Sequence, residues 1–375
     1  MRRNDTMGII LSGTDAIPPI TNSRSVDALP VAGRYRVIDF IISCMSNAGI
    51  QNIGVATNFN YSSLMRHLRV GEPWDLDRKN NGLTVLPPNI EKPNTSVIHG
   101  NIDMLEGIRT FISRSNQTYV VLSLGSGIYN IDLAEAVESH IERQADITMI
   151  YRDKKEDMVE ESEYSRFTLL HMNENERVTD IAIKPHYPDS TLVFLELMVM
   201  EKALLESIID ECVARGETDF MKDAILKKVG AMRIFGHKYE GSAFKIDSMK
   251  SYYQANMRFL QEDFRNAIFN PERPIFTRST AQSPTMYGDE SVIENCFVAD
   301  GGDIDGSACD CIISRNVTIQ KGAVVKNSIL LHNSVIEEGA VVENVVLDRS
   351  VRVTKGRKLI GTSSYPLAIS EETII

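Results

Sequence analysis

One turn in the sequence holds residue types that phosphate chemistry uses. The turn after the apolar residues 8–11 consists of Ser12, Gly13, Thr14 and Asp15. Hydroxyl groups and a glycine are suited to phosphate, because glycine lets successive N–H groups turn toward one anion. Asp15, however, adds a negative charge, and Pro18 and Pro19 each remove a backbone donor. Taken alone, these residues fit an ordinary strand-to-helix loop that is poorly suited to holding a phosphate.

The elements that must position this turn alternate between strand and helix patterns. Strands are predicted at 8–11, 53–57, 119–124 and 147–151, and helices at 37–48, 61–68, 101–112 (capped by Asn101), 133–144, 202–215 and 248–264. Residues 167–172 and 178–183 predict a hairpin. This alternation is typical of a doubly wound, mixed and mostly parallel sheet. Ligands bind at the carboxyl ends of such strands, so the turns after Leu11 and Leu124 are the expected site.

A different period begins near the end of the chain. Apolar residues recur every six positions at Val317, Ala323, Ile329, Val335, Val341, Leu347 and Val353, and a second series runs through Ile313, Ile319, Val325 and Leu331. A hexapeptide period is typical of a left-handed parallel β-helix. We predict a doubly wound (Rossmann-like) domain at 1–268, a linker at 269–289 and a β-helix domain at 290–375. An exposed coil end has unpaired backbone, which favours oligomers.

Composition excludes several classes of protein. The net charge of -11 argues against nucleic acid as a partner, because such binding needs a basic face. No membrane span or export signal is recognisable, and the five cysteines have no zinc spacing or disulfide density. We expect a cytoplasmic protein without a membrane partner. Cys309 and Cys311 are interpreted as small residues in a strand-rich region rather than as a redox pair.

Four segments resemble one enzyme family over nearly the whole chain. They are GRYRVIDF at 33–40, GEPWDLDR at 71–78, GLTVLPP at 82–88 and SYYQANM at 251–257. These segments are similar to motifs of the ADP-glucose pyrophosphorylases (glucose-1-phosphate adenylyltransferases), a family of hexose-1-phosphate nucleotidyltransferases. The resemblance implies transfer of an adenylyl group from ATP to glucose 1-phosphate, with release of pyrophosphate and with Mg²⁺ held by two aspartates.

The sequence departs from the family pattern where that chemistry takes place. The loop at 11–21 keeps only one glycine of the family pattern, Gly13, lacks its arginine and is two residues shorter. Compared with the family, Ser12, Gly13, Thr14 and Asp15 therefore form a degenerate nucleotide loop. Ser126 stands where the resemblance places one metal-binding aspartate, and Lys245 stands where it places the other. A hydroxyl is a poor anchor for Mg²⁺, and an ammonium repels it. Asp247 lies two residues further on and is a candidate ion-pair partner for Lys245. The alternative is that Lys245 is a surface lysine without a role in the site.

Other family features persist in part. Lys184 matches the lysine that contacts the sugar phosphate in the family, although Ile183 replaces the neighbouring glutamate. Arg34 and Arg36 lie in the segment that the resemblance links to effector binding. An interpretation of both arginines as solvated surface charges explains them about as well as effector binding does. Asn58 and Phe59 replace a pair near the nucleotide base.

We therefore expect a non-catalytic or weakly catalytic regulatory subunit in glycogen biosynthesis. The resemblance implies a hetero-oligomer, a heterotetramer, with a catalytic ADP-glucose pyrophosphorylase subunit, and a phosphorylated metabolite as effector. We expect no cofactor or metal on this chain, and Mg²⁺ in the catalytic partner. Three alternatives stay open. They are an active nucleotidyltransferase with a rearranged metal site at Asp132 or Asp247, a sugar-phosphate sensor, and a hexapeptide acyltransferase that uses His332.

Overall fold

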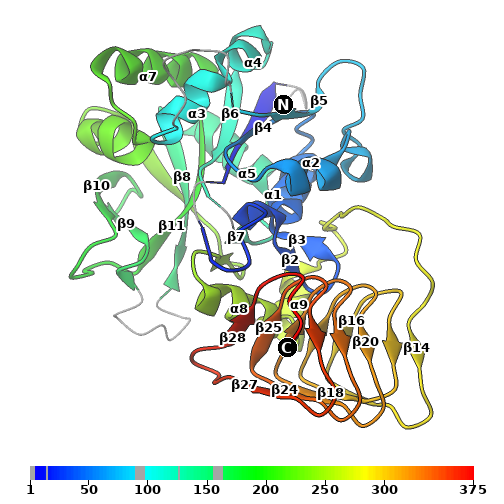
Figure 1. Ribbon diagram of the computed structural model, residues 1–375. Coiled ribbons are helices and arrows are strands. Elements are labelled where there is room, and N and C mark those ends of the chain that lie inside the picture. Colours follow the sequence, from blue (N-terminus) through cyan, green and yellow to red (C-terminus); the bar gives the residue numbers. More distant parts are fainter. Residues whose placement is uncertain (1–4, 14–15, 89–97, 126, 155–163) are drawn as a thin grey trace. The chain divides into compact units, whose positions relative to one another are not determined.

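The computed structural model describes residues 5–13, 16–88, 98–125, 127–154 and 164–375 (Figure 1). Within these ranges the chain forms two compact units. The first takes in residues up to 13, 41–61 and 68–243, and the second takes in 16–40, 62–67 and 244–375. Helices α1 (Val37–Asn47) and α2 (Ser62–Leu68) carry the chain between them. Because the units interleave segments of the chain, the predicted boundaries at residues 268 and 290 stay a prediction.

The described residues of the first unit contain a nine-stranded mixed sheet. Its strands are β1 (Thr6–Ser12), β4 (Asn52–Thr57), β5 (Gly82–Leu86), β6 (Tyr119–Ser123), β8 (Ile147–Asp153), β9 (Thr168–Met172), β10 (Val178–Ile183), β11 (Leu192–Glu201) and β12 (Ile234–Lys238). One path through the sheet runs β10-β9-β11-β6-β1-β4-β5, and β8 pairs with β11 and β12. Strands β6, β1, β4 and β5 are parallel, whereas β11 is antiparallel to its neighbours. The predicted hairpin is β9–β10.

Helices cover both faces of this sheet, as the apolar character of its strands requires. On one face, β1 and β6 share a core with α3 (Asn101–Gly107), α4 (Arg109–Arg114) and α7 (Lys202–Arg215). On the other face Gly8 of β1 lies against Met45 of α1, and α5 (Leu133–Glu142) packs on β8 and β11. The predicted doubly wound domain is therefore confirmed.

Two helix predictions are corrected. The helix at 101–112 divides into α3 and α4, and Gly100, not Asn101, is the residue at its N-cap. The N–H of Ile102 donates to Thr218 O at 3.0 Å, so a carbonyl of a neighbouring loop satisfies the first turn instead of a cap side chain. In the second unit, the helix expected at 248–264 is two helices, α8 (Met249–Arg258) and α9 (Glu262–Ile268), because Gln261 is extended.

The C-terminal part of the second unit is a parallel β-helix built from three stacked sheets. The first sheet holds β14 (Met286–Tyr287), β17 (Asp303–Ile304), β20 (Thr318–Ile319), β23 (Val335–Ile336) and β26 (Arg352–Val353). The second holds β15 (Val292–Glu294), β18 (Ser307–Cys309), β21 (Val324–Lys326), β24 (Val341–Glu343) and β27 (Lys358–Ile360). The third holds β16 (Phe297–Val298), β19 (Ile312–Ile313), β22 (Ile329–Leu330), β25 (Val345–Leu347) and β28 (Leu367–Ile369). The predicted left-handed β-helix is confirmed.

The coil length corrects the predicted period. Thr318 pairs with Val335, and Val335 pairs with Arg352, so these coils advance by 17 residues instead of three full hexapeptides. Corner residues with positive φ repeat at the same interval, for example Gly322, Gly339 and Gly356. The missing residue shifts the pattern, so Ile336 and Val342 enter the core while Val335 and Val341 are half-buried. Within the described part of the chain, no helix is long and apolar enough to cross a membrane.

One buried ion pair ties the segment at 16–40 to the β-helix inside the second unit. The guanidinium of Arg24 pairs with Asp348, and both side chains are almost fully buried. Arg24 also donates to Ile20 O at 2.9 Å, and the N–H of Arg349 donates to Asp348. Removing one partner of a buried pair leaves an uncompensated charge, which destabilises a fold more than loss of a surface pair.

We therefore predict that Arg24→Ala lowers the free energy of unfolding by about 3–5 kcal/mol. The matched control is Arg352→Ala, which removes an exposed pair with Glu337 and should cost at most about 1 kcal/mol. Urea denaturation of both variants measures the difference. Equal losses would show that the Arg24–Asp348 pair behaves as a surface pair.

Candidate functional site

The carboxyl ends of three parallel strands meet at one edge of the sheet in the first unit. Ser12, the last residue of β1, pairs with Thr57 of β4, and Ile10 pairs with Ser123 of β6. The turns that follow β1, β4 and β6 therefore start side by side, as the sequence predicts (Figure 1). Of the predicted loop residues, Ser12 and Gly13 lie at this edge. Thr14 and Asp15 lie outside the described residues.

Two buried polar atoms at this edge have no hydrogen-bond partner among the described residues. They are Ser12 Oγ and Asn58 Oδ1. The residues are in contact, since the N–H of Asn58 donates to Ser12 O at 3.2 Å, and the next residue, Gly13, has φ of +90°. Phe59 follows with its ring 64% exposed. Unsatisfied buried polar atoms need a partner, so this edge still offers polar groups to a small ligand.

The described remainder of the loop, which belongs to the second unit, uses its backbone donors internally. The N–H of Ile17 donates to Thr21 Oγ1 at 2.7 Å, and the N–H of Thr21 donates to Ile17 O at 3.2 Å. The N–H groups of Asn22 and Arg24 donate to carbonyls of the same turn, and Pro18 and Pro19 have no N–H at all. An anion nest needs several converging N–H groups, and residues 17–24 do not provide one.

The structure describes only one of the two predicted metal positions. Ser126 lies outside the described residues. Lys245 is the last residue of β13 (Phe244–Lys245) in the second unit and is half-buried. The carboxylate of Asp247 accepts a hydrogen bond from Ser251 Oγ at 3.1 Å, beside the capping box of α8. Whether Asp247 also pairs with Lys245 stays a prediction.

The chain's own carboxylates do not fit a Mg²⁺ site well. Asp132, the alternative ligand, is the N-cap of α5 and accepts hydrogen bonds from the N–H groups of Ala134 and Glu135. Asp247 is held by Ser251 at the start of α8. Among the residues that the structure describes, His, Cys, Asp and Glu side chains do not gather in threes as metal ligands. A rearranged metal site at Asp132 or Asp247 would have to give up these helix-end contacts.

Sequence reasoning missed one acidic group at the carboxyl edge. Glu196 interrupts β11 at a bulge with φ of +59°, and its carbonyl accepts the N–H of Leu124 at 2.8 Å. A Cβ at Gly125 would lie 1.7 Å from Glu196 Oε2. The carboxylate therefore lies directly beside the turn after β6, where it disfavours a second anion. A non-glycine residue with positive φ leaves no mark in the sequence pattern.

Lys184 is exposed at the end of the hairpin. It follows β10 with φ of +46°, and its N–H donates to Phe167 O at 3.1 Å. The backbone is thus anchored while the ammonium faces solvent, which suits weak phosphate binding.

The predicted effector residues lie on β3 (Tyr35–Arg36) and the turn before it, in the second unit. Arg34 is exposed, and its guanidinium lies 5.8 Å from the centre of the Tyr35 ring. Arg36 is held rigidly, since its Nη1 donates to Ala28 O at 3.1 Å and to Ser63 Oγ at 2.8 Å. Burial lowers the pKa of Arg36 to about 10, so it stays a cation at neutral pH. Arg36 is therefore a positioned charge and not a solvated one.

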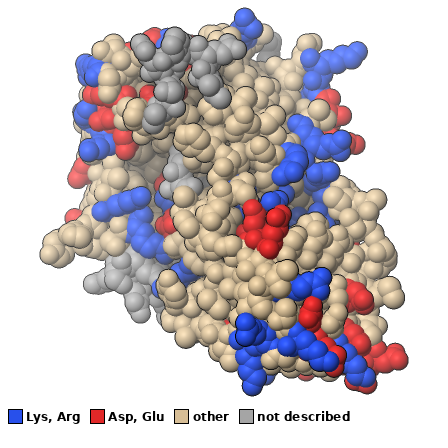
Figure 2. Space-filling model, viewed as in Figure 1, with Lys and Arg blue, Asp and Glu red and all other residues tan. Residues whose placement is uncertain are grey.

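The structure brings further arginines to this place that the sequence analysis did not connect. Arg66 and Arg278 act electrostatically on Arg36, and Arg34 and Arg278 act on Arg315. Arg278 Nη1 donates to Arg66 O at 2.8 Å, and Arg315 Nη2 donates to Arg278 O at 3.4 Å. We call these five residues the arginine cluster; all belong to the second unit. Basic side chains gather over α2, the helix that carries Arg66 (Figure 2).

The arginine cluster carries more positive charge than its surroundings neutralise. Among the described residues, none of the five guanidinium groups has a carboxylate within salt-bridge distance, and the buried Nε of Arg315 has no hydrogen-bond partner. The nearby Asp39 is hydrogen-bonded to His67 Nε2 at 2.5 Å. Burial and the adjacent Arg315 lower the pKa of His332. Asp39 and Asp300 attract these arginines from beyond salt-bridge distance, and the remaining excess of like charge favours an anionic ligand.

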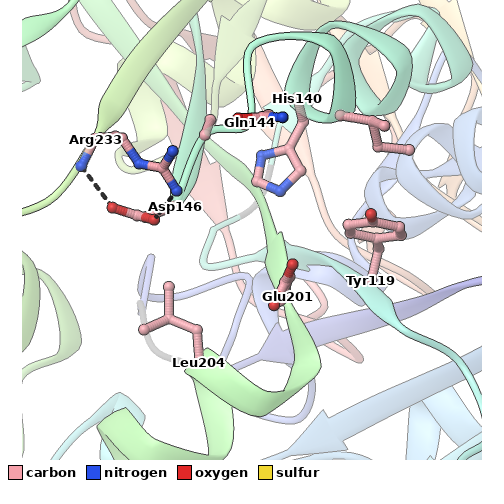
Figure 3. A pocket seen from close by; sticks show the side chains of 9 residues that line it. Tyr119, His140, Gln144, Asp146, Glu201, Leu204 and Arg233 are labelled. Carbon is pink, nitrogen blue, oxygen red and sulfur yellow. Dashed lines mark hydrogen bonds and ion pairs between the residues drawn. The ribbon is translucent and has the colours of Figure 1, made fainter.

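A hollow of about 470 Å³ lies at the opposite, amino edge of the sheet (Figure 3). The ion pair of Arg233 and Asp146 flanks it, with Arg233 Nη2 2.8 Å from Asp146 Oδ1, and Leu204 lines it. His140 is buried beside Tyr119, with ring centres 5.7 Å apart, and its Nδ1 lies 2.9 Å from Thr148 Oγ1. The sequence analysis did not identify this hollow, because its residues come from four separate elements.

Comparison with known proteins agrees with the fold. Residues 7–262 match the family model for nucleotidyl transferases, and residues 280–364 match the model of a GlmU-like C-terminal hexapeptide domain. The class is thus a nucleotidyl transferase fold with a hexapeptide β-helix.

Individual relatives narrow the class. The glycogen biosynthesis protein GlgD of Bacillus subtilis is 31% identical over 98% of this chain and 96% of its own length. A glucose-1-phosphate adenylyltransferase of Clostridium perfringens is 27% identical over 100% of this chain and 97% of its own length. A glucose-1-phosphate adenylyltransferase of Geobacillus stearothermophilus is 30% identical over 82% of this chain and 79% of its own length. The chain therefore belongs to the nucleotidyl transferase family, in the branch that holds GlgD and the glucose-1-phosphate adenylyltransferases. The predicted family is confirmed.

Burial of His140 predicts a pH-dependent stability. Burial lowers the pKa of His140 to about 4, whereas an unfolded histidine titrates near 6.5. Between these pH values the unfolded chain binds the extra proton, so stability is complete above pH 6.5 and falls as the pH drops toward 4.

His140→Gln should reduce this loss of unfolding free energy by about 3 kcal/mol between pH 6.5 and 4. Urea denaturation across this range, beside the exposed-site control His186→Gln, measures it. An identical pH dependence in wild type and His140→Gln would refute the burial argument.

Proposed function

We propose that this chain is a non-catalytic or weakly catalytic regulatory subunit of glucose-1-phosphate adenylyltransferase in glycogen biosynthesis. The catalytic partner makes ADP-glucose and pyrophosphate from ATP and glucose 1-phosphate. The observation that carries the proposal is the hydrogen bonding of residues 17–24. The N–H groups of four of these residues donate within their own turn, so they are not available to a triphosphate unless these bonds break. They are those of Ile17, Thr21, Asn22 and Arg24. One relative is named a glycogen biosynthesis protein and the other a glucose-1-phosphate adenylyltransferase, and these names indicate the pathway and the reaction.

Electrostatics support the loss of catalysis. Phosphoryl transfer between two anions needs cations and N–H donors at the reacting phosphates. Here Glu196 places a carboxylate beside the turn after β6. Lys245 puts an ammonium at one metal position of the family pattern, and Asp132 caps a helix. Without metal stabilisation the barrier rises by several kcal/mol, equivalent to a thousandfold or slower rate.

The arginine cluster supports the regulatory part of the proposal. Arg36 is locked by Ala28 and Ser63, and Arg315 has a buried donor with no partner. Guanidinium groups bind phosphate through paired N–H donors in a fixed plane. A metabolite with two phosphate groups matches several separated guanidiniums better than a single anion does. We assign the predicted phosphorylated effector to this cluster, with Arg34 at its exposed rim.

The first test is reconstitution with a catalytic glucose-1-phosphate adenylyltransferase subunit. We expect the isolated chain to form little ADP-glucose, the two chains to co-elute as a hetero-oligomer, and the mixture to exceed the partner's rate or effector response. No joint complex and unchanged partner kinetics would contradict the proposal. Mg²⁺-dependent synthesis by the isolated chain that Asp132→Asn or Asp247→Asn abolishes would instead establish the rearranged enzyme.

The second test concerns the effector. Arg34→Ala and Arg315→Ala should each weaken binding of a sugar bisphosphate to the isolated chain by about tenfold, because a hydrogen bond to a charged group contributes about 1.5–3 kcal/mol. Calorimetry measures the affinity, and Arg352→Ala, a paired arginine outside the cluster, is the control. Unchanged affinity in the Arg34→Ala/Arg315→Ala double variant would show that the arginine cluster does not bind the effector.

A further inference from the structure

Two cysteines of the β-helix lie directly opposite each other on neighbouring coils. In the third sheet Phe297 of β16 pairs with Ile312 of β19, and the N–H of Phe297 donates to Cys311 O at 2.9 Å. Cys296 and Cys311 are the residues immediately before this pair, so they occupy the same level of adjacent parallel strands. Parallel neighbours are about 4.8 Å apart, and a disulfide needs Cα atoms about 4.4–6.8 Å apart. The backbone therefore brings the two thiols within bridging range.

The surroundings distinguish the two sulfur atoms. Cys311 is fully buried in the β-helix core, whereas Cys296 is partly exposed on the first coil. Contact with Cys311 lowers the pKa of the Cys296 thiol, which in its protonated form donates to Glu294 O at 3.1 Å and to Ala308 O at 3.5 Å. The same contact raises the pKa of Cys311. Reactivity follows thiolate character and access, and both favour Cys296.

Cys309 supplies an internal comparison two residues from Cys311. It is partly exposed like Cys296, but its Sγ lies 3.3 Å from Asp310 Oδ2 and 3.9 Å from Glu294 Oε2. These carboxylates raise the pKa of the Cys309 thiol. The remaining cysteines, Cys44 and Cys212, are buried. Cys296 is thus the one thiol of the chain that combines exposure with stabilisation of its thiolate.

We propose that Cys296 and Cys311 form a thiol–disulfide exchange site for low-molecular-weight disulfides of the glutathione type. The Cys296 thiolate attacks one sulfur of the small disulfide, forming a mixed disulfide and releasing one small thiolate, which takes up the proton that Cys296 gave up. Cys311 then loses its proton and attacks the Cys296 sulfur, and the second small thiol leaves. The two cysteines are oxidised by two electrons, and the small disulfide is reduced to two thiols.

The bridge would be reversible and would act on the open end of the β-helix. Cβ atoms of in-register parallel neighbours are farther apart than the roughly 3.8 Å that a relaxed disulfide prefers, and strained disulfides are more readily reduced. Strands β14, β15 and β16 each end the strand order of their sheet, so the first coil is paired on one side only. The Cys296–Cys311 bond ties this coil to the next, which opposes local opening of the coil edge.

The experiment treats the full chain with oxidised glutathione and maps cysteine peptides by mass spectrometry. In wild type we expect a Cys296–Cys311 cross-link that dithiothreitol reverses, and slower proteolytic cleavage of residues 286–300. Cys311→Ser should retain a stable glutathione adduct on Cys296, because the resolving thiol is gone. Cys296→Ser should form neither product, and the matched control Cys309→Ser should cross-link as wild type does.

Wild-type kinetics decide the question even if a variant fails to fold. Iodoacetamide should alkylate Cys296 faster than Cys309, because the pKa of the Cys296 thiol is lowered and that of the Cys309 thiol is raised. Equal labelling of Cys296 and Cys309, or a Cys309 adduct without any Cys296–Cys311 cross-link, would overturn the proposal. Both readouts are independent of catalysis, so they separate this site from the proposed subunit function.

Discussion

A backbone N–H has one hydrogen to donate, and the loop after β1 can hold an anion only with donors that its own turn leaves unused. In a phosphate-binding loop the N–H groups converge on empty space, and glycines allow the required backbone angles. Here Thr21 supplies both a hydroxyl acceptor for Ile17 and an N–H that closes the same turn. The turn is therefore complete without a ligand. To bind a triphosphate it would first have to break contacts that already satisfy it.

The same comparison of satisfied and unsatisfied groups distinguishes the arginine cluster from the carboxylates of Asp132 and Asp247. Asp132 and Asp247 are bound at helix N-termini, where a carboxylate is already stabilised. The arginine cluster is the opposite case, because its cations are held by carbonyls and hydroxyls that leave the positive charge uncompensated. Carbonyl oxygens position a guanidinium without neutralising it. Such an arrangement stays favourable only when an anion or water completes it.

The sequence predicted more of the fold than of the site, for physical reasons. Strong periodicity placed β1, β4, α7 and the β-helix closely, since burial on one or both faces controls those patterns. The six-residue periodicity did not reveal the 17-residue coil. A coil that is one residue shorter than three hexapeptides appears in the sequence only as a shift from one apolar series to the other. Arg66, Arg278 and Arg315 lie far apart in the chain, so only the packing of the second unit connects them. Glu196 escaped because a bulge, rather than a residue type, directs its side chain.

The division into two units places the carboxyl edge of the sheet and the arginine cluster in separate packing units. The segments at 16–40 and 62–67 pack as one unit with the β-helix, although they come from the N-terminal part of the chain. That unit contains the whole arginine cluster, the Arg24–Asp348 pair and the Cys296–Cys311 site. The orphaned polar atoms of Ser12 and Asn58 and the carboxylate of Glu196 belong to the first unit. Substitutions at the carboxyl edge of the sheet therefore leave the contacts within the second unit intact, including those that hold the arginine cluster.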